Sequence, residues 1–144
     1  GFRVKMELDS AIPIVPICAK VESDLSDLEG EDLQMFLEEL GATESGLESL
    51  IHKAFDLLGL QSYFTAGVQE VRGWTIYQGD TAPRAAAAIH TDFEKGFIKA
   101  EVIGYEDYIA NGGEKGAKEA GKARQEGKEY LVADGDVIHF KFNN

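Results

Sequence analysis

Apolar and polar residues alternate along the end of the chain with the period of two that β-strands show. Within Val137–Phe142, one face holds an isoleucine and two phenylalanines, and the other includes a histidine and a lysine. The β-forming segment Tyr130–Val132 comes before it, and Asp134 and Gly135 are a tight-turn pair between the two. This pattern predicts a closing β-hairpin.

Two earlier segments, Tyr63–Thr65 and Val71–Tyr77, are a further pair of strand candidates, joined by a short linker that contains Gly67. A further strand is expected within the segment Gly96–Val102, where β-forming residues recur. The second part of the chain is therefore expected to be rich in strands.

One main helix is predicted between these strands. Pro83 fits its first turn, the alanines at positions 85–88 favour it, Ile89 and Phe93 lie four residues apart on one face, and Gly96 suits the position after its end. A strand pair, a helix, a strand, short helices and final strands predict an α+β fold. We expect a ubiquitin-like β-grasp, a small mixed sheet folded over one main helix.

Two amphipathic helices are predicted in the first part of the chain. The first ends at Gly41; the second begins with Ser45 and Glu48 as a capping box and ends at Gly59. Their apolar stripes consist of Leu33, Phe36, Leu37 and Leu40, and of Leu47, Leu50, Ile51, Ala54 and Leu58. Each of these acidic helices shows an apolar face that another part of the protein should cover.

The apolar and β-branched segment Ala11–Ala19 predicts one buried strand that runs into a loop, with Pro13 and Pro16 restricting regular pairing. A lone buried strand needs a neighbour. The alternating apolar residues of positions 2–8 supply one if they form a strand, but the same residues also fit the end of a helix.

Charge is distributed unevenly along the 144 residues, whose net charge is −12. Residues 1–58 hold 4 basic and 13 acidic side chains, whereas residues 59–144 hold 10 and 13. The charge pattern therefore places a boundary near Gly59. Because phosphate attraction needs clustered lysine and arginine, the overall acidity argues against indiscriminate binding to nucleic acid or to anionic membranes.

A cytoplasmic protein without a membrane partner is expected. The single cysteine, Cys18, excludes a disulfide framework within the chain, and the sequence contains neither a signal peptide nor an apolar run of transmembrane length. The chain begins with Gly1 instead of an initiator methionine, which suggests a fragment of a longer protein, a processed chain or a chain shortened for expression.

Several short motifs occur in a fixed order along the chain. They are Tyr63-Phe-Thr-Ala-Gly, Glu70-Val-Arg, Trp74-Thr-Ile, Thr81-Ala-Pro, Ile89-His-Thr-Asp-Phe-Glu-Lys-Gly-Phe-Ile and Asp134-Gly-Asp-Val. Together they resemble the TGS domain of the YchF (Obg-like) ATPase family. The likeness continues N-terminally through Ile17-Cys-Ala-Lys and Leu57-Leu-Gly-Leu, so it covers nearly all of the chain except its first ten residues. The family usually has alanine at the position of Gly73, where we expect a weakened strand or a bulge.

The resemblance implies that residues 1–58 are the last strand and helices of a P-loop α/β nucleotide-binding domain, and that residues 59–144 are a TGS β-grasp domain. The parent protein would bind and hydrolyse ATP or GTP with Mg²⁺ and act on or near the ribosome. The P-loop motif Gly-x-x-x-x-Gly-Lys-Ser/Thr is absent from this sequence, so we expect neither hydrolysis nor a bound cofactor in the chain alone. The alternative is an autonomous β-grasp interaction module without a nucleotide role.

A nucleotide-base loop is suggested by Cys18, Ala19 and Lys20. These residues are similar to the Ser-Ala-Lys base-recognition loop of P-loop GTPases, in which a backbone N–H contacts the base. Loops that follow strands in α/β domains commonly carry ligand contacts, which favours this interpretation. The alternative is a plain exit from a strand into a loop.

The candidate RNA-binding or ribosome-binding residues are the basic concentration Lys115, Lys118, Lys122, Arg124 and Lys128. The first three follow the helical spacing i, i+3, i+7, after a glycine-rich segment, 111–116, that predicts a mobile loop. One interpretation is contact with RNA phosphates, and the other is a solvated helix whose lysines pair with glutamates.

No metal site is expected, since the three histidines are far apart in sequence and Cys18 stands alone. The segment His90–Phe93 is interpreted as a helix-end packing and hydrogen-bond unit. Aromatic residues at strand spacing are more often core than base-stacking platforms, which need an exposed face rimmed with basic residues. This applies to Tyr63, Phe64, Trp74, Phe93 and Phe97.

Overall fold

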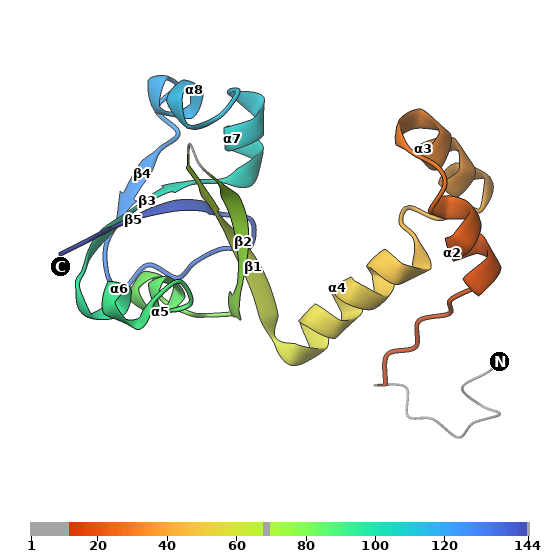
Figure 1. The fold of residues 1–144 in the computed structure, drawn as a ribbon, viewed down its shortest axis with the longest axis horizontal. Helices are drawn as coiled ribbons and strands as arrows, with labels where there is room; N and C mark the ends of the chain where they lie inside the picture. Colours follow the sequence, from red (N-terminus) through yellow and green to blue (C-terminus); the bar gives the residue numbers. More distant parts are fainter. Residues whose placement is uncertain (1–11, 68–69, 144) are drawn as a thin grey trace. The chain divides into compact units, whose positions relative to one another are not determined.

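The computed structural model describes residues 12–67 and 70–143 and divides into two compact units, Gly1–Leu58 and Gly59–Asn144 (Figure 1). The described part of the first unit contains the helices α2 (Ala19–Leu25), α3 (Gly30–Glu39) and α4 (Gly46–Leu58). The second unit combines a five-stranded sheet with short helices, so the coarse prediction of an α+β protein is confirmed. The alternating residues of positions 2–8 lie outside the described residues.

The start of α4 has the predicted capping box. The Ser45 backbone N–H donates to Glu48 Oε2 at 2.8 Å, and the Glu48 N–H donates to Ser45 Oγ at 3.1 Å. The hydrogen bond from the Ser45 backbone lowers the pKa of the Glu48 carboxyl group. Glu22 of α2 adds its carboxylate to the same helix end, accepting from the N–H groups of Gly46 and Leu47 at 2.8 and 3.2 Å. These bonds tie α2 to α4.

The predicted buried strand over Ala11–Ala19 is wrong for the residues that the structure describes. Residues 12–18 are irregular, Ile12 and Ile17 are each 46% exposed, and α2 begins at Ala19. A strand needs neighbours for its backbone N–H and C=O groups, and this unit has no strand among its described residues. Pro13 and Pro16 also lack the N–H that a ladder requires.

The sheet of the second unit has the strand order β2-β1-β5-β3-β4. Its strands are β1 (Leu60–Ala66), β2 (Val71–Tyr77), β3 (Phe97–Ile103), β4 (Arg124–Glu126) and β5 (Val137–Phe142). The predicted pairing of the first two strands is confirmed, because β1 and β2 are antiparallel in continuous register. Gly73 stands opposite Phe64 in that register, so the bulge expected there is absent.

The predicted closing hairpin is wrong. β5 runs parallel to β1 and antiparallel to β3, and Leu131 forms only an isolated bridge to Thr81. The turn itself is present, with Gly135 at a φ of +80°. The segment before it is held by backbone hydrogen bonds to Asp80 and Ala82 and by side chains. The buried Asp136 carboxylate accepts hydrogen bonds from the Tyr130 hydroxyl at 2.7 Å and the Ala133 N–H at 2.9 Å. Burial and the bond to this carboxylate raise the pKa of Tyr130 to about 12.

The predicted main helix is broken into α5 (Ala82–Ala87) and α6 (Thr91–Lys95). His90 lies between them in an extended conformation, and its Nδ1 accepts from the Asp92 N–H at 3.2 Å. The interpretation of His90–Phe93 as a helix-end unit is thereby confirmed. A side-chain acceptor at this position starts a new helix, which explains why the helical pattern does not continue as one element.

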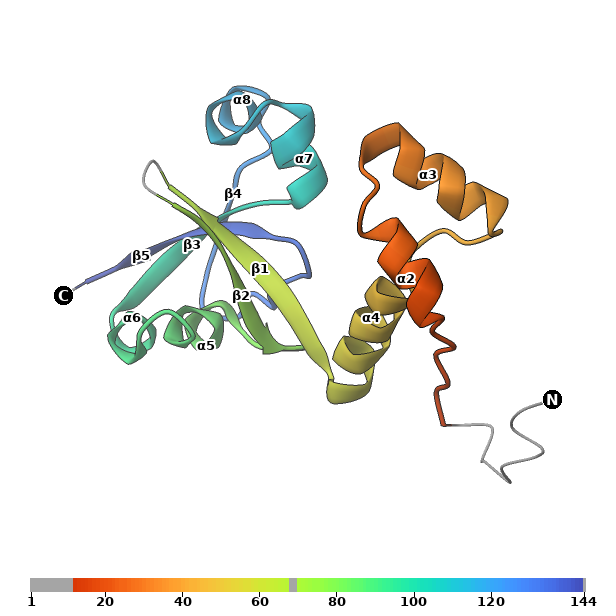
Figure 2. The same ribbon diagram turned by 45° about the vertical axis from the view of Figure 1, so that its right-hand side comes forward.

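The main core of the second unit lies between the sheet and α5–α6. Tyr63 is completely buried there, and its hydroxyl donates to the Ala85 carbonyl at 2.9 Å. Its ring meets that of Phe140 edge to face at 5.7 Å. Helices α7 (Tyr105–Ala110) and α8 (Glu114–Glu119) lie on the other side of the sheet from α5 and α6 (Figures 1 and 2).

The connection between α7 and α8 is a tight turn rather than the predicted mobile loop. Gly112 and Gly113 have positive φ angles, and α8 already begins at Glu114. Gly116 packs so closely on the Asn111 carbonyl that a Cβ atom would overlap its oxygen. Glycine at this position therefore allows the first turn of α8 to lie against the end of α7.

Replacing Gly116 with alanine should destabilise the second unit by about 2 kcal/mol, since the added methyl group meets a backbone atom that cannot rotate away. Gly127→Ala is the matched control, because nothing lies within 4 Å of a Cβ built there. Denaturant unfolding followed through the fluorescence of the single tryptophan, Trp74, measures both variants. Equal stabilities would contradict the packing argument.

The two units should differ when they are produced separately. Residues 59–144 are expected to fold alone because the hydrophobic core cluster belongs to them. Residues 1–58 are expected to depend on contacts outside themselves, since Leu25 and Leu37 are the buried hydrophobic residues of their described part. Amide exchange of the two separate pieces provides the measurement. Strong protection in the isolated 1–58 piece would oppose this expectation.

Candidate functional site

The structure places Cys18 directly before α2 and Ala19 and Lys20 in the first turn of that helix. Cys18 is exposed and lines an open cavity of about 540 Å³ within the first unit, beside Glu22 and Ser45. Lys20 forms an ion pair with Asp24 at 3.1 Å, one helical turn away. The three residues are therefore accessible. Both carboxylate oxygens of Glu22 already accept hydrogen bonds from the N-terminus of α4.

Most of the clustered basic side chains in the second unit form ion pairs with carboxylates. Lys118 Nζ lies 3.1 Å from Glu101 Oε2 of β3 and 2.6 Å from Glu114 Oε1. Its hydrogen bonds to the two carboxylates raise the pKa of Lys118, and the bond from Lys118 lowers the pKa of Glu114. Lys118 thus links α8 to the sheet.

The remaining members of this stretch have different surroundings. Lys122 pairs with Asp107 at 3.1 Å, and Arg124 lies 3.7 Å from Glu126 and 3.8 Å from Asp136. Lys115 is 90% exposed with a long contact of 4.0 Å to Glu119, while exposed Lys128 forms no ion pair with any described residue. Lys115 and Lys128 are thus the members whose charge is least neutralised.

The predicted helical spacing of Lys115, Lys118 and Lys122 holds for the first two alone. α8 ends at Glu119, and Gly121 turns the chain away with a φ of +70°. Lys122 therefore lies beyond the helix, where it is free to reach Asp107 on α7. A continuous basic helix face does not form.

The interpretation of the aromatic residues as core is confirmed for Tyr63 and Phe97, which are buried. Trp74 is partly buried against the core, and its Nε1 donates to Thr65 Oγ1 at 2.9 Å. The Arg72 guanidinium lies 4.2 Å from the Trp74 ring centroid and covers part of it. This contact keeps the ring from acting as an open stacking platform in the observed conformation.

The histidines lie in separate places. His52 lies 2.7 Å from Glu44 in the first unit, and His139 Nε2 lies 3.0 Å from Lys141 Nζ on β5. Within the described ranges, 12–67 and 70–143, no three histidine, cysteine, aspartate or glutamate side chains gather as a metal site. None of the described helices is long and apolar enough to cross a membrane.

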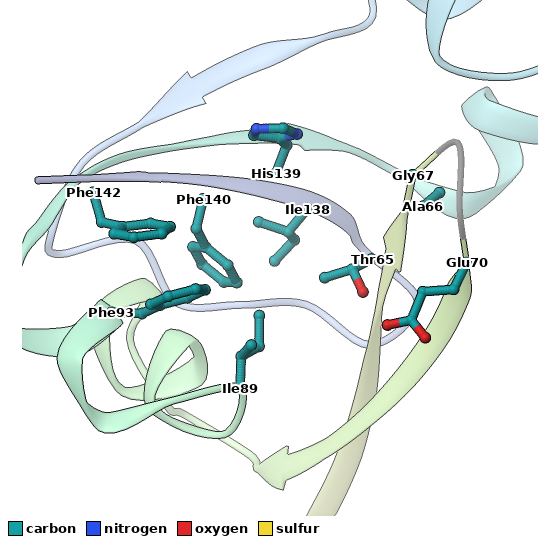
Figure 3. A pocket seen from close by; sticks show the side chains of 10 residues that line it. All are labelled: Thr65, Ala66, Gly67, Glu70, Ile89, Phe93, Ile138, His139, Phe140 and Phe142. Carbon is teal, nitrogen blue, oxygen red and sulfur yellow. The ribbon is translucent and has the colours of Figure 1, made fainter. Parts of the chain in front are cut away.

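Sequence reasoning missed an open cavity of about 550 Å³ on the α5–α6 side of the sheet (Figure 3). Residues from the β1–β2 hairpin, from the region of α5 and α6, and from β5 line it. They are Thr65, Ala66, Gly67 and Glu70; Ile89 and Phe93; and Ile138, His139, Phe140 and Phe142. The rings of Phe93 and Phe142 stack at 3.7 Å, which gives the cavity an aromatic end.

No local sequence pattern predicts this cavity. Its lining residues come from segments more than 70 positions apart in the chain. The alternation of β5 did predict that Ile138, Phe140 and Phe142 share a face, yet an apolar face normally indicates core. Ile138 and Phe140 are indeed buried, and Phe142 alone of the three is partly exposed.

Comparison with known proteins gives consistent matches over this chain. A family model, YchF-GTPase_C, described as a protein of unknown function (DUF933), matches residues 60–143. Ribosome-binding ATPase YchF of Bacillus subtilis is 62% identical over 130 residues, covering 90% of this chain and 36% of that protein. Obg-like ATPase 1 of Gallus gallus is 49% identical over 145 residues, covering 99% and 36%.

A solved structure agrees with these sequence matches. The structure of the Schizosaccharomyces pombe YchF GTPase is similar with a TM-score of 0.76 at 35% identity, over 96% of this chain and 37% of that one. The chain therefore spans little more than a third of the length of these relatives. Because the family model covers more than half of its residues and the resemblance of its motifs is confirmed, this chain belongs to the YchF family.

Proposed function

We propose that this chain is the C-terminal, non-catalytic part of a YchF-like P-loop ATPase or GTPase, with a regulatory and ribosome-binding or RNA-binding role. The observation that carries the proposal is the 62% identity, over 90% of the chain, to a protein named as a ribosome-binding ATPase. In this proposal ATP or GTP with Mg²⁺ binds elsewhere in a cytoplasmic parent protein. The chain itself supplies contacts to the ribosome.

The second unit is proposed to be a TGS domain of the β-grasp type. Its sheet supports this assignment, since an antiparallel hairpin is followed by helices and the last strand runs parallel to the first in the middle of the sheet. Helices α5 and α6 occupy the place of the one grasped helix. The break at His90 is a departure from a single helix.

The first unit is proposed to be the end of the P-loop nucleotide domain, with the rest of that domain as its partner. Exposed apolar side chains on α4 support this proposal, because a helix in water normally hides such a face. They are Leu47, Leu50, Ile51, Leu57 and Leu58, with exposed fractions of 43–71%. Cys18, Ala19 and Lys20 would then lie near the nucleotide base, as the resemblance implies.

The autonomous interaction module remains the second candidate, favoured by the open cavity on the second unit. The coding sequence upstream of Gly1 separates the two proposals. A Gly-x-x-x-x-Gly-Lys-Ser/Thr motif there supports the P-loop parent. A start codon directly before Gly1 would oppose that parent and favour the module.

The isolated chain should not bind ATP measurably at micromolar concentrations. The sequence lacks a phosphate-binding P-loop, and any contacts from Cys18–Lys20 to a base would be few and exposed to solvent. Calorimetry with Mg²⁺ and ATP tests this expectation, and the parent protein is the positive control. Micromolar binding to the isolated chain would require a phosphate site that the proposal does not contain.

In the parent protein, the double variant Lys115→Glu/Lys128→Glu should weaken ribosome binding and flatten its salt dependence by about one to two counterions. These two lysines are exposed and little neutralised, so their charge is available to phosphate. Lys95→Glu/Lys141→Glu makes the same charge change at exposed sites of the same unit and serves as the control. Ribosome pelleting across a salt series measures the effect.

Lys118→Glu belongs in the same experiment as a structural comparison. It would set a third carboxylate beside Glu101 and Glu114, so loss of binding in that variant alone would reflect damage to α8. Unchanged affinity and salt slope in the Lys115/Lys128 variant would remove the basic stretch from the proposed contact. The ATPase rate of the parent is expected to stay unchanged in all these variants.

A further inference from the structure

The two central strands of the sheet separate soon after they meet. Their parallel register consists of the single pair Phe64 and Val137, although β1 has seven residues and β5 has six. On its other side, β5 pairs with β3 along its whole length. The edge of β5 that faces β1 is therefore open beyond Val137.

The direction of the backbone groups on this edge follows from the one hydrogen bond before it. The Phe64 N–H donates to the Asp136 carbonyl at 2.8 Å, so alternate residues from Asp136 onward direct their backbone groups toward β1. The Asn143 N–H donates to the Gly96 carbonyl beside β3 at 2.8 Å, which agrees with this alternation. Phe140 and Phe142 thus present N–H and C=O groups to a gap where β1 provides no partner.

The cavity in Figure 3 lies along this open edge. The side chains of Ile138, Phe140 and Phe142 point from β5 toward Ile89 and Phe93, as the figure shows. Its volume of about 550 Å³ is within the range of about 300–1,000 Å³ that small ligands or a few side chains fill. An unpaired strand edge beside an apolar hollow is the arrangement that accepts an added strand.

Charge at the mouth of the cavity favours one kind of strand. Glu70 lines the mouth and forms no ion pair with any described residue. The second unit, which holds the cavity, has 13 acidic and 10 basic side chains. A basic segment is attracted by both, whereas the phosphates of a nucleic acid are repelled.

We infer that the open edge of β5, with the cavity beside it, binds an extended basic segment of a partner protein by strand addition. Backbone groups of the segment pair with Phe140 and Phe142, an apolar side chain enters the hollow near Phe93, and a lysine or arginine meets Glu70. The inference does not depend on the ribosomal proposal, because it rests on the register, the cavity and the charge of Glu70.

The position of this edge inside the sheet restricts the occupant to a single chain. β5 lies between β1 and β3 in the strand order, and the outer edges belong to β2 and β4. The folded sheet of a second copy cannot approach an inner edge, since β1 and β2 stand beside it. A segment that is unstructured before binding can pair with β5 alone, lying about 5 Å from it, the spacing of neighbouring strands.

The test titrates the isotope-labelled full chain with a ten-residue peptide in which lysine and valine alternate around one central phenylalanine. We expect saturable amide shifts centred on Ala66, Phe140 and Phe142. A peptide of the same composition with its apolar residues contiguous keeps the charge and loses the alternation. A peptide N-methylated at alternate residues keeps its side chains and loses the backbone donors, and both should bind about tenfold more weakly.

A charge-reversed variant of the chain adds an independent readout. Glu70→Lys should weaken peptide binding several-fold, while Glu106→Lys, an equal charge change at an exposed site on α7, should not. Equal binding of all three peptides, or shifts centred away from β5, would overturn the inference. So would a single-stranded oligouridine that shifts the same amides.

The same titration of the parent protein distinguishes a separate partner protein from a segment of the parent chain as the occupant of the edge. Binding of the alternating peptide to the parent with similar affinity supports a separate partner. Loss of peptide binding in the parent would show that its own chain occupies the edge, and the inference of a partner protein would then be wrong.

Discussion

The attachment of the segment before β5 to the side of β1 is the constraint on which the second unit depends. The Ser62 carbonyl accepts from the Gly135 N–H at 2.8 Å, the Ser62 N–H donates to Asp134 Oδ1 at 2.8 Å, and Gln61 Nε2 donates to the Val132 carbonyl. The Phe64 N–H then bonds to the Asp136 carbonyl. These bonds join the β1–β2 hairpin to the half of the sheet that contains β5, β3 and β4.

The buried Asp136 carboxylate makes that attachment specific. Only 3% of the residue is exposed, and its Oδ2 accepts from both the Tyr130 hydroxyl and the Ala133 N–H. An unpaired carboxylate would be costly in this position, so the surrounding groups must stay in place for the fold to form. The register of β5 with β1 consists of the pair Phe64 and Val137, and the cavity lies beside the part of β5 that follows.

Electrostatic pairing shapes the other side of the sheet. Lys118 between Glu101 and Glu114, and Lys122 beside Asp107, use basic side chains to hold α7 and α8 in place. Exposed ion pairs of this kind are each worth about 1 kcal/mol or less, but they compete with phosphate for the same charges. An acidic chain can therefore offer an external nucleic acid only those lysines that its own carboxylates leave free.

Much of this architecture follows from short-range patterns in the sequence. Alternation predicted β5, runs of β-forming residues predicted β1, β2 and β3, the capping box predicted the start of α4, and the ordered motifs identified the family. These features depend on local backbone preferences and on side chains a few residues apart. The tertiary structure decided that Tyr130–Val132 forms no hairpin, that His90 divides a helix, that residues 12–18 form no strand, and that the lysines pair with distant carboxylates. Each of these outcomes depends on contacts between residues that are far apart in the sequence. The periodicity of apolar and polar residues contains no information about such contacts.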